Sequence, residues 1–221
     1  NLKKGVETIL SKNGFLSYYG REKKLDTYET TIEYKRFEPK DDRYFAAYIE
    51  ENMVGKGIPK MSEGLHKKFI ESIFEIFSNA VIHSKTKMGI FSCGQFFPNK
   101  KRLVFSIADL GIGILKNVKE HIKREMTADQ AISWAVEGKN TTKVGRIPGG
   151  LGLKLLREFI TMNQGRIQIV SDKGYWELSG GKAFTRSFLN PFPGTTVNIE
   201  INTADTNSYC LSSEIKSEDI F

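Results

Sequence analysis

A strict alternation of apolar and polar residues near the end of the chain constrains the fold most. Across residues 195–201, every second side chain is apolar. These positions are Val197, Ile199 and Ile201. A strand with this period has one face packed and one face in water, which is typical of an antiparallel sheet covered on a single side. We therefore expect a two-layer α/β sandwich, with a mixed, mostly antiparallel sheet and helices on one face, rather than a doubly wound fold.

Turn and capping signals divide the rest of the chain into elements for such a sandwich. The predicted strands cover residues 30–37, 88–97, 101–109, 166–170, 175–178, 183–188 and 195–201. The predicted helices cover residues 41–54, 62–83, 128–137 and 152–163. We expect the sandwich domain to span residues 60–202. Residues 1–59 form an N-terminal extension that offers an edge strand and a helix to the same domain, and residues 203–221 form a polar, loose C-terminal tail.

Composition narrows the class of protein. The net charge is +7, from 33 basic and 26 acidic residues, and the basic residues are scattered in small groups. Scattered charges indicate a solvated surface rather than a groove for nucleic acid, so we do not expect a nucleic-acid partner. No stretch approaches the roughly 18 apolar residues of a membrane span. Two cysteines and no recognisable signal peptide favour a reducing compartment, and we expect a cytoplasmic protein.

The predicted helix over residues 62–83 carries one polar stripe on an otherwise apolar surface. Its members, spaced by four residues, are Glu71, Glu75, Asn79 and His83. Residues at this spacing share one face of a helix. Such a stripe is typical of the solvated face of a buried helix, and equally of a functional site. Asparagine is a poor residue for a helix interior, which keeps the functional interpretation open.

Two glycine-rich segments follow that helix. Asp109 ends a hydrophobic strand and precedes Gly111 and Gly113, so a carboxylate that can accept from an exocyclic amine lies beside backbone that a flat ligand can approach closely. Gly150 and Gly152 open a helix, where free N–H groups and the helix dipole attract anions. A plain turn and a hinge are the alternative interpretations of the two segments. Neither segment is a P-loop or a dinucleotide fingerprint.

Taken in this order, the stripe and the two segments resemble the GHKL (Bergerat-fold) ATPases, a class that includes gyrase-type topoisomerase subunits, heat-shock chaperones and sensor histidine kinases. The residues that carry the resemblance are Glu75 and Asn79 in the N box, Asp109, Gly111 and Gly113 in the first glycine box, Gly150, Gly152 and Leu153 in the second, and Thr195 in a late strand motif. A histidine four residues after the asparagine, as at His83, is most similar to the anti-sigma-factor serine kinases. The match covers residues 60–202.

The resemblance implies that the chain binds ATP and Mg²⁺. It implies that Asn79 ligates Mg²⁺ through its side-chain oxygen, and that Glu75 orients or deprotonates the attacking water or hydroxyl. Asp109 would accept from the adenine amine. The remaining implied nucleotide contacts are His83, Gly111, Gly113, Ile114, Gly149, Gly150, Leu151, Gly152, Leu153 and Thr195. Residues 115–148 would form a lid over the nucleotide.

Three basic residues near the end of this lid are candidates to neutralise phosphate charge. They are Lys139, Lys143 and Arg146. Ordinary solvated loop charges are the alternative interpretation.

The leading functional hypothesis is slow ATP hydrolysis that switches contacts with a protein partner or an upstream domain. A serine protein kinase of the anti-sigma type is the alternative enzyme, and Glu75 serves both reactions. A nucleotide-dependent interaction module without turnover is the alternative outside enzymes. A nucleic-acid-binding domain with an incidental motif match ranks last.

Overall fold

A five-stranded antiparallel sheet organises the chain. The computed structural model describes residues 2–137 and 151–215. The strands are β1 (Thr31–Phe37), β3 (Ile90–Phe97), β4 (Arg102–Asp109), β5 (Arg166–Ser179) and β6 (Lys182–Asn202). They lie in the order β1-β3-β4-β6-β5, and every neighbouring pair is antiparallel. The predicted edge strand is therefore confirmed as β1.

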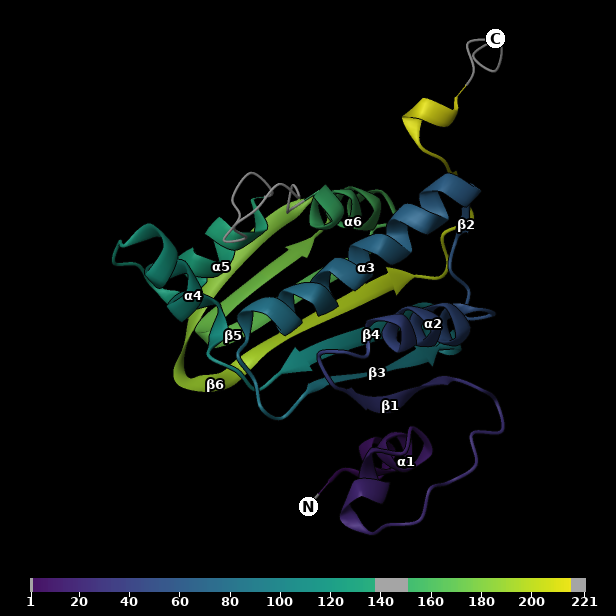
Figure 1. Ribbon diagram of the computed structural model, residues 1–221. Helices are drawn as coiled ribbons and strands as arrows, with labels where there is room; N and C mark the ends of the chain where they lie inside the picture. Colours follow the sequence, from purple (N-terminus) through teal and green to yellow (C-terminus); the bar gives the residue numbers. More distant parts are fainter. Residues whose placement is uncertain (1, 138–150, 216–221) are drawn as a thin grey trace.

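Helices cover one face of this sheet, as the alternation predicts. They are α2 (Asp42–Met53), α3 (Glu63–His83), α4 (Gly113–Ile122), α5 (Ala128–Val136) and α6 (Leu151–Met162). Figure 1 shows α2, α3 and α6 lying across the sheet, with α4 beside α5 near one end. The core between the layers includes the buried side chains Phe69, Ile73, Phe77, Leu103, Phe105 and Ile107. The two-layer α/β sandwich is thus confirmed.

Local signals explain where the central helix begins and why it is buried. The Ser62 hydroxyl accepts from the backbone N–H of Leu65 at 3.2 Å, which satisfies a free donor of the first turn. Most of the other faces of α3 are apolar and pack against the sheet and α6. This packing fixes the position of the polar stripe of α3 relative to the sheet.

Strands β5 and β6 contain the pairs of shorter strands that the sequence predicts. The register between them shifts at Ser171, Asp172 and Gly174. The Gln168 side chain donates to the Tyr175 hydroxyl at 2.8 Å, seven residues further on. A straight strand would separate those residues by about 23 Å, at about 3.3 Å per residue. The chain must therefore turn back within β5, at the break predicted between residues 170 and 175.

The two ends of the chain attach to the sandwich. Helix α1 (Lys4–Lys12) and the 3₁₀ helix η1 (Phe15–Tyr19) contact β1, where the Phe15 and Tyr18 rings lie edge-on to Tyr34. Strand β7 (Ser208–Tyr209) pairs in parallel with β2 (Lys60–Met61). The start of the expected loose tail is therefore anchored at β7. Backbone pairing with β2 holds it, and the Tyr209 ring packs on Phe159.

Candidate functional site

A cavity between the helices and the sheet gathers most of the described site residues. It has a volume of about 180 Å³ and is lined by α3, α4, α5, α6 and strands β4, β5 and β6. The predicted site residues that line it are Glu75, Asn79, His83, Asp109, Gly113, Ile114, Leu153 and Thr195. Segments that are more than 100 positions apart in the chain therefore form one site.

The floor of the cavity is apolar and ends in a polar row. Ile107 of β4 is in register with Val197 of β6, which is in register with Ile169 of β5. Two residues away in each strand, Thr195 of β6 is in register with Asp109 of β4 on one side and with Ser171 of β5 on the other. All of these except Ser171 line the cavity. A flat ligand with an apolar face and a polar edge fits this pattern.

The Asp109 carboxylate is the buried charge of the site. Its residue is only 4% exposed, and the Gly111 N–H donates to its Oδ1 at 2.8 Å. Burial raises the pKa of the Asp109 carboxyl, and the backbone N–H groups of Gly111 and Thr195 offset part of that rise. A carboxylate held this way attracts a further hydrogen-bond donor.

The end of α3 is tied to the loop that follows Asp109. The Ile112 N–H donates to the Ser84 carbonyl at 2.8 Å, and the Asn117 amide donates to the His83 carbonyl at 2.8 Å. These bonds satisfy carbonyls that a helix leaves free at its C-terminus. They also fix the polar stripe of α3 relative to Asp109.

Gly111 has a different reason for being glycine from the one that the sequence indicates. We expected it to make room for a base, but a Cβ atom at this position would lie 2.0 Å from the Ser84 carbonyl oxygen. Its role in the structure is the close approach of the loop to α3. Gly113 does line the cavity, and its φ of +75° favours glycine.

Gly111→Ala is expected to lower the free energy of unfolding by about 1–3 kcal/mol, because the methyl group meets backbone that must shift. Gly5→Ala is the matched control, since nothing lies within 4 Å of its Cβ position and alanine is the better helix former. Urea denaturation of both variants measures the difference. Equal stability of the two variants would contradict the packing role of Gly111.

One member of the polar stripe lies on a solvated face, and the other three lie in the candidate site. Glu71 is exposed and forms an ion pair with Lys68 at 2.8 Å, as on a solvated face. Glu75, Asn79 and His83 line the cavity instead. Spacing places all four on one face, but only the last three lie where the helix passes over the cavity.

The contributors to the site that were missed from the sequence include polar and aromatic residues. Ser171 is 1% exposed, and its hydroxyl accepts from the Ile114 N–H at 2.8 Å and lies 3.0 Å from the Thr195 hydroxyl. It continues the period of two that precedes it, which was the available signal. Asn117 and Trp134 line the cavity from α4 and α5, and no motif marks them.

Several predicted phosphate contacts lie outside the described residues. They are Lys139, Lys143, Arg146, Gly149 and Gly150. Leu151 and Gly152 begin α6, of which the described side chains start at Leu153. Within residues 2–137 and 151–215, no three His, Cys, Asp or Glu side chains gather into a metal-binding group.

Comparison with models of known protein families and with curated proteins gives no match. No helix in the described ranges is long and apolar enough to cross a lipid bilayer. What the cavity binds is therefore inferred from its geometry and from the motifs that line it.

Proposed function

We propose that this cavity binds ATP with Mg²⁺ and that the protein hydrolyses the nucleotide slowly, as a GHKL-type switch. The observation that carries the proposal is the buried Asp109 carboxylate at the end of an apolar floor, in the same cavity as Glu75 and Asn79. These are the three side chains to which the resemblance assigns base recognition, catalysis and metal binding.

The chemistry of adenine supports the assignment of the floor. Adenine has apolar faces and an amine on one edge, so its face fits against Ile107, Ile169 and Val197 while its amine donates to Asp109. Guanine presents a carbonyl oxygen at the corresponding position. Two acceptors would then face each other in a buried site, which is costly. The geometry therefore favours ATP over GTP.

The donor set fits a metal ion that arrives with the nucleotide. Asn79 offers the cavity one neutral oxygen, beside the carboxylate of Glu75 one turn earlier. Mg²⁺ keeps several waters and is usually held by one or two protein oxygens together with substrate phosphates. Bound there, it would offset the negative charge of the phosphate oxygens.

Glu75 supplies the chemical step in this proposal. A water oxygen forms a bond to the γ-phosphorus while the bond from that phosphorus to the bridging oxygen breaks, and ADP leaves with the electron pair. The Glu75 carboxylate takes the proton that the water loses and later returns it to solvent. Glu75 lines the cavity wall, as this role requires.

Calorimetric titration with ATP and with GTP tests the proposal, with and without Mg²⁺, together with an assay for released phosphate. We expect ATP to bind at least about tenfold more tightly than GTP, the equivalent of one buried hydrogen bond. We also expect Mg²⁺ to strengthen ATP binding, and phosphate to be released slowly. Equal affinity for the two nucleotides, or no binding of either, would overturn the assignment of the cavity.

A further inference from the structure

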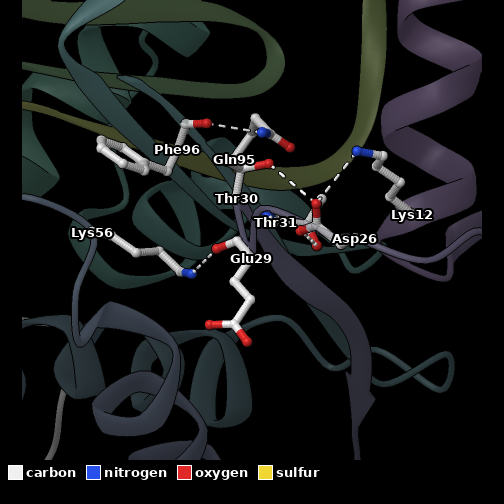
Figure 2. A network of polar contacts seen from close by, with 8 residues as sticks. All are labelled: Lys12, Asp26, Glu29, Thr30, Thr31, Lys56, Gln95 and Phe96. Carbon is white, nitrogen blue, oxygen red and sulfur yellow. Dashed lines mark hydrogen bonds and ion pairs between the residues drawn. The ribbon is translucent and has the colours of Figure 1, made fainter. Parts of the chain in front are cut away.

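A second cleft is lined by residues between Lys12 and Lys56. It is open to solvent and has a volume of about 580 Å³. Its charged lining residues are Lys12, Lys23, Lys24, Asp26, Glu29, Glu33, Glu51 and Lys56. Figure 2 shows part of this network, in which Asp26 and Glu29 lie between the side chains of Lys12 and Lys56.

Lys56 is the unusual member of this group. Its residue is 7% exposed, and it sits between Gly55 and Gly57, both with positive φ, in a loop that places the side chain inside the protein. Its ammonium donates to the Glu29 carbonyl at 2.6 Å. An ammonium has three donors, and among the described residues no carboxylate lies within 4.0 Å of this one. Lys56 therefore keeps donors for another acceptor.

Two of the acids that line the cleft are already paired. Asp26 accepts from the Thr31 N–H at 2.6 Å and the Thr31 hydroxyl at 2.8 Å, and it pairs with Lys12 at 3.4 Å. Lys23 pairs with Glu33 at 2.5 Å. The charges of the cleft that have no ion pair within the described ranges are Lys24, Lys56, Glu29 and Glu51. The cleft thus offers unpaired charge of both signs.

A buried ammonium without a counter-ion is costly, and such groups are normally paired. Burial lowers the pKa of Lys56, and the nearby acids Asp26 and Glu29 offset part of that fall without forming an ion pair with its ammonium. A dianion such as phosphate would satisfy Lys56 but would meet Glu29 and Glu51 in the same cleft. A single carboxylate beside a positive group matches the unpaired charges better.

We propose that this cleft binds a small zwitterion, an α-amino acid, whose carboxylate accepts from Lys56 and whose ammonium faces Glu51. Lys56 reaches the cleft from the loop after α2, and Glu51 reaches it from the last turn of α2. The site is separate from the nucleotide cavity, with which it shares no lining residue.

Thermal-shift titration without nucleotide tests the site, using each of the common amino acids singly, with acetate, methylamine and inorganic phosphate for comparison. At least one amino acid should raise the melting temperature of the parent protein more than acetate or methylamine does. Lys56→Met should weaken its binding about tenfold or more, since a hydrogen bond to a charged group is lost. Glu51→Gln should weaken binding as well. Lys60→Met, an exposed lysine outside the cleft, should not.

Each other outcome overturns the proposal. If Lys56 served only to hold the Glu29 carbonyl, Lys56→Met would lower the melting temperature equally with and without ligand. If acetate alone gave the full effect and Glu51→Gln changed nothing, the site would not select a zwitterion. A larger effect from phosphate than from every amino acid, or no effect from any compound, would equally rule it out. None of these results depends on ATP, so they leave the proposed nucleotide cavity to its own test.

Discussion

Glu75→Ala is expected to lower the rate of ATP hydrolysis about 10²- to 10⁴-fold while ATP affinity stays nearly unchanged, as for the loss of a general base. Affinity should persist because, in this proposal, Asp109 and the apolar floor would hold the base without help from Glu75. The comparison of titration calorimetry with a phosphate-release assay separates the two effects. This experiment rests on the proposed nucleotide function.

Glu71→Ala is the matched control for this prediction. Glu71 lies one helical turn before Glu75 on the same stripe, but it is exposed and paired with Lys68 outside the cavity. Removing it should leave turnover within about twofold, because an exposed ion pair contributes little. Similar loss in both variants would mean that the stripe acts through helix stability, and that Glu75 is not the base.

The elements were largely predictable because their signals are local. The capping serine and the apolar surface of residues 62–83 predict α3, and the helix runs from Glu63 to His83. The period of two at Leu103, Phe105 and Ile107 predicts β4 and the face that it buries. Side-chain periodicity and capping depend on neighbours within about one turn or one strand, so a single sequence contains them.

The assembly of the site depends on contacts that no local pattern contains. Gly111 meets Ser84 across 27 positions of the chain, and the Ser171 hydroxyl meets Thr195 only because β5 and β6 pair in one register. The anchoring of β7 to β2 was missed for the same reason. The order of the motifs along the chain predicts that the cavity residues share one function. Their closeness in space depends on the sheet topology, which no local pattern contains.

Asp109→Asn is expected to weaken ATP binding about 10- to 100-fold, the equivalent of a hydrogen bond to a charged group. The carboxylate can accept from the Gly111 N–H and from a ligand amine at the same time. An asparagine has one oxygen, and the backbone N–H groups of Gly111 and Thr195 compete for it. Its amide N–H₂ would then face the adenine amine. Asp42→Asn, at an exposed position of α2, is the matched control and should bind ATP like the parent.

Asp109→Asn should weaken ATP binding, but it should not lower the stability of the ligand-free protein. Burial raises the pKa of Asp109, so between its ordinary pKa and the raised one the folded chain holds more protons than the unfolded chain. The stability that this group contributes is therefore greatest in acid and falls as the pH rises through the raised pKa. At pH 7 the buried charge opposes folding, and Asp109→Asn should melt at a temperature equal to or above that of the parent. Melting curves between pH 4 and pH 7 should show the melting temperature of the variant rising relative to that of the parent as the pH increases. The parent carries the buried negative charge at the higher pH, and the variant does not. A variant that loses both ATP binding and stability at neutral pH would show that Asp109 is a structural carboxylate rather than a recognition group held in the cavity at the expense of stability.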